Sequence, residues 1–239
     1  MPYSQPPRPD RSAIEGRFCQ LVPLSLHHAA DLFAAQAEDA GGAMWAYMPN
    51  GPFADLAAYE AWLASAIAGD DPLQFAVVVA GRAVGTMSLM RIDPGAGTIE
   101  IGYVAFPPAL QRTIAATEAF YLLIKWSFEA GYRRLEWKCN ALNVPSRMAA
   151  LRLGLSYEGV FRQAAVVKGR NRDTAWFAVI DVEWPQLYAA FEHWLDAANF
   201  DAAGQQHVSL SSLTAEIVAH SVAAEALTRP APGQVGALV

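Results

Sequence analysis

Apolar residues alternate with polar ones along several short segments of the chain, and they recur at helical spacing along others. Alternation predicts strands, whereas apolar positions three and four residues apart predict amphipathic helices. The expected strands cover residues 15–22, 73–79, 83–91, 98–106, 135–139, 157–167 and 174–182. The expected helices run from Ser25 through Phe33, from Asp55 to Gly69, over 113–130, from Asn143 to Gly154, and onward from Pro185.

The longest expected helix, residues 113–130, is apolar on nearly all sides. Its charged exceptions, Glu118, Lys125 and Glu129, are predicted to share one stripe. This composition is typical of a helix that is buried in the domain, and Gly131 is a suitable residue to end it.

Strands and helices follow one another in a mixed order, and the strands between residues 73 and 106 look like consecutive hairpins. This order predicts one α/β (α+β) domain over residues 14–200, with a mostly antiparallel sheet and helices on both faces. Residues 1–13 and 201–239 have too little apolar surface to offset the entropy lost on ordering. We expect both to be flexible tails, with a short helix over 213–227.

Composition and charge narrow the function. Hydrophobic residues make up 54% of the 239 residues, so the chain can bury a substantial core. The net charge of -6 argues against a nucleic-acid binder and leaves amine-bearing partners open. No apolar run approaches the roughly 18 residues of a membrane span, and the first ten residues lack the apolar segment of a secretory signal. We therefore expect a cytoplasmic protein that binds neither nucleic acid nor membrane.

Metal chemistry finds no support in the pattern of ligand residues. Cys19 and Cys139 lie far apart and have no neighbouring cysteine, so we expect both to be reduced core residues. The histidines show no metal-ligand spacing, and they are His27, His28, His193, His207 and His220. We predict no metal. The motifs of serine hydrolases and of P-loop NTPases are also missing.

The stretch from residue 99 to residue 118 is the most informative part of the chain. An apolar strand leads through a short loop into the N-terminus of the long helix, where free backbone N–H groups and the helix dipole favour a phosphate. Arg112 adds a full positive charge at this point. The alternative is that the junction is merely structural, because every strand–loop–helix junction has free N–H groups.

The sequence of this junction resembles motif A of the GNAT acetyltransferases, in which Gln/Arg-x-x-Gly-x-Gly/Ala binds the pyrophosphate of acetyl-CoA. Gln111, Ile114 and Ala116 occupy the three motif positions. In the second half, Asn143-Val-Pro-Ser146 and the segment 154–159 resemble the RimJ/RimL-like branch of that family. The resemblance covers residues 16–184 and implies the GNAT fold, with acetyl-CoA as co-substrate and direct transfer of the acetyl group to a primary amine.

The resemblance also implies a coenzyme site. Its expected members are Val104, Ala105, Gln111, Arg112, Thr113, Ile114, Ala115, Ala116, Thr117, Asn143 and Ser146. One departure concerns Ile114, which stands where the family usually has glycine. Glycine lets the backbone approach the pyrophosphate closely, and a β-branched residue does the same only if its side chain points into the core.

Glu100 is the candidate general base because it is the one charged residue of an apolar strand. The alternative is a structural glutamate that pairs with an arginine of a neighbouring strand, such as Arg91. The tyrosine that many GNAT enzymes use as general acid is replaced by Ala150. Ser146 and Tyr157 are the remaining candidates for that role, although a first-turn helix residue and a core ring are their simpler interpretations.

By family analogy, the acceptor site consists of the loop 41–53 and the last hairpin. The candidate residues are Trp45, Tyr47 and Phe53 in the loop and Lys168, Arg170 and Arg172 in the expected turn 168–173. Aromatic residues that cap the core and solvated turn charges are the alternatives. The acceptor is expected to be a small-molecule amine or a protein N-terminal amine.

Two other functions stay open at this point. A GNAT-fold module that binds CoA or a partner without transfer would account for Ile114 and for the missing tyrosine. An interaction protein would use the aromatic loop and the C-terminal tail. Dimers are common in this family, so a homodimer is a further expectation.

Overall fold

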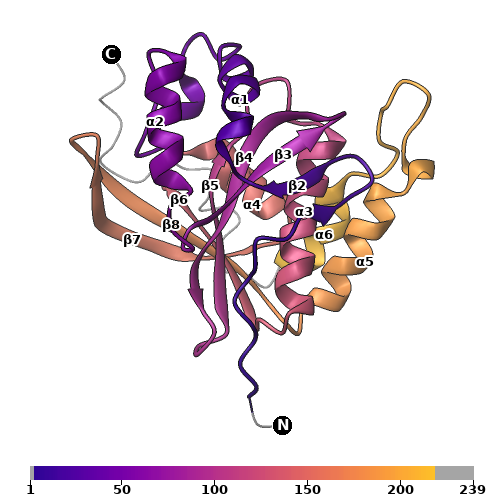
Figure 1. Cartoon of the computed structure of the whole chain (residues 1–239). Helices are drawn as coiled ribbons and strands as arrows, with labels where there is room; N and C mark the ends of the chain where they lie inside the picture. The colour runs from indigo at the N-terminus through magenta and orange to yellow at the C-terminus, as the bar shows by residue number, and fades with distance from the viewer. Residues whose placement is uncertain (1–2, 219–239) are drawn as a thin grey trace.

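The computed structural model describes residues 3–218, which form one mixed sheet with helices on both faces (Figure 1). The strand order is β1-β2-β3-β4-β5-β6-β8-β7, and among these neighbours only β5 and β6 run parallel. The strands are β1 (Ile14–Glu15), β2 (Gln20–Pro23), β3 (Leu73–Val79), β4 (Arg82–Asp93), β5 (Thr98–Ala105), β6 (Arg134–Asn140), β7 (Ser156–Val167) and β8 (Arg170–Ile180). The predicted fold class is confirmed.

The helices divide between the two faces because residues alternate in direction along each strand. On β3, Phe75 and Val77 join the large core under α3–α6, whereas Ala76 joins the small core under α1 and α2. The helices are α1 (Ala29–Gln36), α2 (Leu56–Ala66), α3 (Ile114–Glu129), α4 (Val144–Arg152), α5 (Trp184–Leu195) and α6 (Leu210–Val218), with 3-10 turns η1 (Leu26–His28), η2 (Ala43–Trp45) and η3 (Ala197–Asn199).

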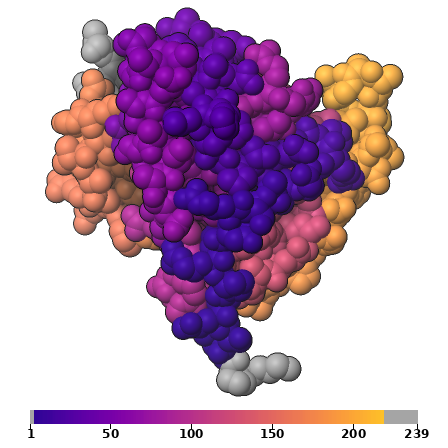
Figure 2. Space-filling view, in the orientation of Figure 1, coloured from indigo at the N-terminus to yellow at the C-terminus, as the bar shows by residue number. Residues whose placement is uncertain are grey.

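Both expected tails make contacts with the domain where they are described. Residues 3–13 contain no helix or strand, yet Arg8 donates to the carbonyl of Ile92 and the Tyr132 hydroxyl donates to the carbonyl of Pro7, each over 3.0 Å. This segment runs along the surface of the domain (Figure 2). At the other end, α6 begins before the helix expected at 213–227, and residues 219–227 lie outside the described part. The domain boundaries stay a prediction.

Glu118 corrects the prediction of a polar stripe on α3. Its side chain is only 2% exposed, and its carboxylate accepts the backbone N–H groups of Arg17, Phe18 and Cys19 over 2.6–2.9 Å. A Cβ on Gly16 would lie 2.5 Å from this carboxylate, so only glycine fits there. The expected strand 15–22 is therefore split at this turn into β1 and β2.

The last hairpin is tighter than predicted. Strand β7 runs to Val167 and β8 begins at Arg170, so the turn contains only Lys168 and Gly169. Both turn residues have positive φ, 50° and 74°, as a two-residue hairpin turn requires. The prediction of a turn over 168–173 was wrong, and Arg170 and Arg172 lie on β8.

Candidate active site

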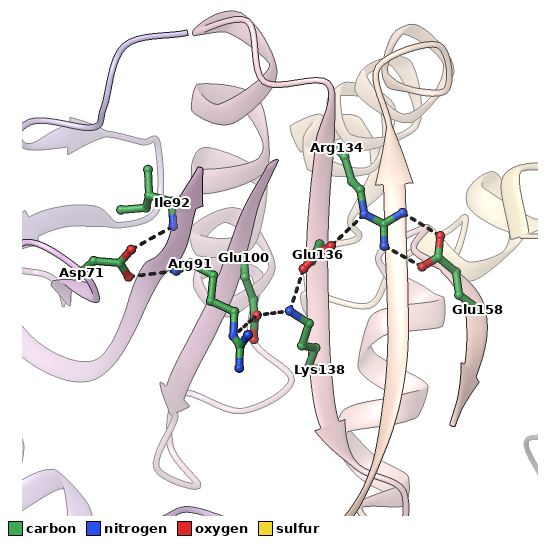
Figure 3. A network of polar contacts seen from close by, with 8 residues as sticks. All are labelled: Asp71, Arg91, Ile92, Glu100, Arg134, Glu136, Lys138 and Glu158. Atoms are coloured by element: carbon green, nitrogen blue, oxygen red, sulfur yellow. Dashed lines mark hydrogen bonds and ion pairs between the residues drawn. The ribbon is translucent and has the colours of Figure 1, made fainter. Parts of the chain in front are cut away.

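Strands β5 and β6 separate at the middle of the sheet. Their parallel pairing ends at Ile101 and Trp137, although β5 continues to Ala105 and β6 to Asn140. Beyond that point β5 pairs only with β4, and β6 only with β8. Figure 3 shows the two strands moving apart toward their C-terminal ends.

A bulge marks β5 where it leaves β6. Gly102 pairs with Ser88 and Ala105 with Thr86, so β5 has one more residue than β4 over this stretch, and Tyr103 has a φ of +48°. A bulge leaves backbone groups unpaired. The predicted contacts of Val104 and Ala105 with the coenzyme arm therefore fall where the backbone is irregular.

The N-terminus of α3 follows this bulged strand after the loop 106–113. Thr113 caps it, because its hydroxyl accepts the N–H of Ala116 over 3.1 Å and donates to the carbonyl of Leu110. The side chain of Gln111 donates to the carbonyl of Phe106 over 2.7 Å and so braces the loop. Ile114 and Ala115 are the first residues of the helix, where N–H groups have no partner in a preceding turn.

The remaining predicted phosphate-binding residues differ in whether a side chain or a backbone N–H group is free to bind a phosphate. Arg112 is exposed and has a φ of +63°, so its guanidinium is accessible beside the helix start. The Ile114 side chain packs against the large core. The N–H groups of Ala116 and Thr117 are already bonded, to the hydroxyl and the carbonyl of Thr113.

Arg152, which the sequence analysis did not select, adds a second cation near this helix end. Its Nη1 donates to the Thr117 hydroxyl over 3.1 Å, and its guanidinium lies 5.0 Å from the ring centre of Trp194. Burial lowers the pKa of Arg152, and no ion pair with a carboxylate forms within residues 3–218. In the sequence, only its position as a basic residue in the last turn of the predicted helix 143–154 could have indicated Arg152.

Glu100 lies on the face of the sheet opposite α3 and is 4% exposed. Its Oε2 is 2.7 Å from Nζ of Lys138 and 3.2 Å from Nε of Arg91 (Figure 3). The pairing with Arg91 that was weighed as an alternative is thus present. The other carboxylate oxygen, Oε1, takes no part in these two contacts and lies toward Gly102.

These residues belong to an alternating chain of charges that we call the inner network. Its members are Arg91, Glu100, Lys138, Glu136, Arg134 and Glu158 (Figure 3). Lys138 lies 2.7 Å from Glu136 and is as buried as Glu100, with its side chain 6% exposed. Its Nζ also lies 3.9 Å from the ring centre of Trp176.

The pKa values of the two inner carboxyl groups shift in opposite directions. Burial raises the pKa of Glu100 above its ordinary value, although Lys138 and Arg91 oppose the shift. Burial alone would also raise the pKa of Glu136, but hydrogen bonds from Lys138 and Arg134 outweigh it and hold that pKa below its ordinary value. The arrangement can therefore hold a carboxylate of raised basicity beside the point where β5 and β6 separate.

Ser146 and Tyr157 lie on the other face of the sheet from Glu100. The Ser146 hydroxyl accepts the indole N–H of Trp137 over 3.0 Å, and its backbone N–H is capped by the side chain of Asn143. The ring of Tyr157 packs on Phe177 at 5.4 Å between centres, beside the large core. The structure does not bring either hydroxyl together with Glu100.

The two predicted acceptor elements meet. Nζ of Lys168, at the tip of the β7–β8 hairpin, donates to the carbonyls of Trp45 and Gly51 over 2.9 and 2.6 Å. Tyr47 of the same loop donates to the carbonyl of Leu142 over 3.2 Å. The rings of Trp45 and Phe53 meet edge to face with their centres 5.4 Å apart, and Phe53 packs against the small core, as the alternative interpretation expected.

Two surface hollows are lined neither by Glu100 nor by the residues at the start of α3. One hollow of about 770 Å³ lies along the irregular part of β7 and is lined by Phe161, Arg162, Gln163, Ala164, Asn171 and Asp173. Another of about 230 Å³ lies under residues 9–15. Within residues 3–218, no cluster of three metal-ligand side chains occurs and no helix is both long and apolar enough to cross a membrane.

The family model and the similar solved structures all describe GNAT acetyltransferases. A family model described as the acetyltransferase (GNAT) domain matches residues 19–156, which is more than half of the chain. The crystal structure of a GCN5-related N-acetyltransferase from Brucella melitensis is 45% identical, with a TM-score of 0.87, and covers 90% of this chain and 99% of that chain. A probable acetyltransferase of the GNAT family from Chromobacterium violaceum ATCC 12472 is 42% identical, with a TM-score of 0.73 over 77% of this chain and 93% of that chain.

Among curated proteins, the uncharacterized N-acetyltransferase YnaD of Bacillus subtilis (strain 168) is 30% identical over 91 residues, or 38% of this chain. The match spans about half of that relative, 53% of its length. Two more distant structures, each with a TM-score of 0.62 and 20% identity, share the fold. One is the self-immunity acetyltransferase MccE in complex with acetyl-CoA and AMP, and the match covers 69% of this chain and 93% of that chain. The other is Mycobacterium smegmatis RimJ in complex with CoA-disulfide, and the match covers 74% of this chain and 90% of that chain.

Proposed function

The chain belongs to the GNAT acetyltransferase family, and on that premise we propose that it transfers an acetyl group from acetyl-CoA directly to a primary amine in a ternary complex. The predicted membership of the GNAT family is confirmed, and the protein is an acyltransferase by family. The observation that supports acetyl-CoA most strongly is the separation of β5 from β6 immediately before the open N-terminus of α3. MccE, with the same fold, was crystallised with acetyl-CoA.

In this proposal the pyrophosphate binds at the start of α3. The N–H groups of Arg112, Ile114 and Ala115 donate to it, the dipole of α3 favours its charge, and the guanidinium of Arg112 pairs with it directly. Ile114 is compatible with this role because its side chain packs into the core and leaves the backbone N–H free. Gln111 and Thr113 shape the loop through their own hydrogen bonds rather than by reaching the phosphate.

The pantetheine arm then runs along the bulged end of β5. Backbone groups of Val104 and Ala105 hold it and polarise the thioester carbonyl. Asn143 and Ser146 line the same passage from α4. A thioester placed between β5 and β6 is accessible from the face of Glu100, where the amine arrives.

Glu100 acts as the general base. The carboxylate takes a proton from the ammonium form of the acceptor through Oε1, directly or through one water, while Lys138 and Arg91 hold Oε2. The neutral amine attacks the thioester carbonyl, the C–S bond breaks as the CoA thiolate leaves, and the nitrogen gives up a second proton to water as the amide forms. Ser146 and Tyr157 lie on the coenzyme side of the sheet and are the candidates to protonate that thiolate.

The acceptor is a small-molecule amine or a protein N-terminal amine, bound between the loop 41–53 and the β7–β8 hairpin. Lys168 supports this placement because it ties the two elements together. We further propose a cytoplasmic location and a homodimer, in line with the family.

A second candidate function is CoA binding without transfer. Two observations favour it: Ile114 replaces the usual glycine, and Ala150 replaces the usual tyrosine. Glu100, paired with Lys138 and Arg91, would then be purely structural.

Acetyl-CoA-dependent release of thiol, measured with a panel of amines, tests the proposal. Turnover with at least one amine class, abolished when the amine is omitted, is the expected result. CoA binding by calorimetry with no turnover on any amine would select the second candidate. Absence of both would refute a coenzyme site at α3.

A further inference from the structure

Three buried side-chain donors that lack a hydrogen-bond partner within residues 3–218 lie on the two predicted acceptor elements. They are Nδ2 of Asn50 in the loop 41–53, and Nε of Arg172 and Nε1 of Trp176 on β8. Buried donors without partners are rare in folded proteins and costly, so each requires an explanation. Lys168 ties these two elements together, and a ligand with hydrogen-bond acceptors bound between them would satisfy these donors.

Two of the three donors lie on one face of β8, and the third lies on the loop that the hairpin tip contacts. Alternation along β8 places Arg172 and Trp176 on the same face, and Trp176 faces Lys138, which contacts Glu100. Four hydrogen bonds link the β7–β8 hairpin to the loop 41–53, either directly or through residues 141–142. Lys168 donates to the carbonyls of Trp45 and Gly51, the N–H of Ala141 donates to the carbonyl of Asp173, and the Tyr47 hydroxyl donates to the carbonyl of Leu142.

Charge distinguishes Arg172 from the cations of the inner network. Arg91, Arg134 and Lys138 each contact a carboxylate, whereas Arg172 has none within the described chain. The loop 41–53 contains no acidic residue. The neighbouring carboxylate of Asp173 is bonded to the N–H of Gln163 and the amide of Asn171. The half-buried guanidinium of Arg172 therefore has no carboxylate partner within residues 3–218.

We propose that the acceptor amine carries an anionic group, a carboxylate or a phosphate, which binds Arg172 while Asn50 and Trp176 donate neutral hydrogen bonds to the acceptor. This inference rests on the proposed function and specifies its substrate class. Four residues of β8 separate Arg172 from Trp176, or roughly 13 Å along the strand. The anion is thus several bonds away from the reacting amine, and an α-amino acid is too short to reach both places.

The test uses straight-chain ω-amino carboxylates of increasing length as acceptors. Unsubstituted amines of equal length serve for comparison. One ω-aminoalkyl phosphate shows whether the site prefers a phosphate to a carboxylate. The wild-type protein should prefer the longer amino carboxylates over the plain amines. Arg172→Gln should raise KM for the charged acceptors tenfold or more and leave KM for acetyl-CoA unchanged. Arg162→Gln is the matched control, since Arg162 is exposed on the neighbouring strand β7 and is not one of the predicted acceptor residues, and it should change neither constant.

A second readout keeps this inference separate from the proposed function. Calorimetric titration with the longest amino carboxylate measures binding whether or not acetyl transfer occurs, and Arg172→Lys with melting curves of all variants checks folding. Binding that is lost in Arg172→Gln but kept in Arg162→Gln supports the anion site even if no amine turns over. Three results would overturn the anion site: turnover with no preference for charged acceptors, equal binding of the amino carboxylate by both variants, or no binding of it by the wild-type protein.

Discussion

The inner network and the cations of the β7–β8 hairpin differ in what neutralises them. In the inner network each cation contacts a carboxylate, and the chain of contacts runs from β4 across β5 and β6 to β7. On the hairpin, Lys168 binds two backbone carbonyls, and neither Arg170 nor Arg172 forms an ion pair within residues 3–218.

This difference separates two uses of charge on one sheet face. Paired charges that are removed from water fix the position and the pKa of a group such as Glu100. A charge that is partly removed from water and has no ion-pair partner can form that ion pair with a ligand of opposite charge. The comparison therefore predicts that changes to the inner network alter stability and chemistry, whereas changes to the hairpin alter acceptor binding.

The largest effect is expected for Lys138→Met. The substitution leaves Glu100 and Glu136 buried side by side on paired strands without their shared cation. Breaking a buried ion pair by removing one partner costs about 3 to 5 kcal/mol, and urea denaturation measures it. The double variant Lys138→Met/Glu100→Gln removes one of the stranded charges and should recover part of the loss. A loss below about 1 kcal/mol would mean that water reaches these carboxylates.

Glu100→Gln should lower turnover by about 100-fold and leave CoA affinity unchanged, because only the base is removed. The base must be ionised and burial raises the pKa of Glu100, so wild-type kcat/KM falls as the pH is lowered through that raised value. This acidic limb lies above the ordinary glutamate range and should vanish in the variant. Glu158→Gln, at the exposed end of the network, is the control and should keep the limb. Normal turnover by Glu100→Gln would leave the residue a structural role alone.

Arg112→Ala should weaken CoA binding by about 1 kcal/mol, the low end for a charge-assisted hydrogen bond because Arg112 is exposed. Calorimetry at two salt concentrations measures this, and the difference from wild type should shrink at high salt. Ile114→Gly in the same assay should bind CoA as well as wild type or better. Unchanged affinity of Arg112→Ala would remove this arginine from the site, and a clear loss in Ile114→Gly would make the isoleucine a packing residue first.

Lys168→Met should have the smallest effect. It removes the two hydrogen bonds that tie the hairpin tip to the loop 41–53, and it should raise KM for the acceptor about threefold, without changing KM for acetyl-CoA. Steady-state kinetics with both substrates varied separates the two constants. A rise in the acetyl-CoA constant alone would place the hairpin tip on the coenzyme side.

Much of the fold was accessible from the sequence because local signals agreed with one another. Asp55 and Asn143 cap α2 and α4 as predicted, and the mixed order of elements gives the observed class. The hairpin turn was misplaced because the polar run 168–173 is typical of a loop, while positive φ at only two residues already closes the turn.

The candidate site was less accessible, for a physical reason. Glu136 and Lys138 alternate with Leu135, Trp137 and Cys139, a pattern that is normally interpreted as a strand with one face in water. These side chains are instead buried, and Lys138 contacts both Glu136 on its own strand and Glu100 on β5, a strand distant in sequence. Alternation cannot distinguish a charge in water from a charge paired with another strand, so only the register of β5 and β6 revealed Lys138.

A crystal structure of the protein with CoA tests the central claim most directly, namely that the separation of β5 and β6 brings coenzyme and acceptor together. We expect the pyrophosphate within hydrogen-bond distance of the N–H groups of Arg112, Ile114 and Ala115. The CoA sulfur should lie between the diverging strands, accessible from the face of Glu100. CoA bound elsewhere, or with its sulfur shielded from that face, would contradict the account.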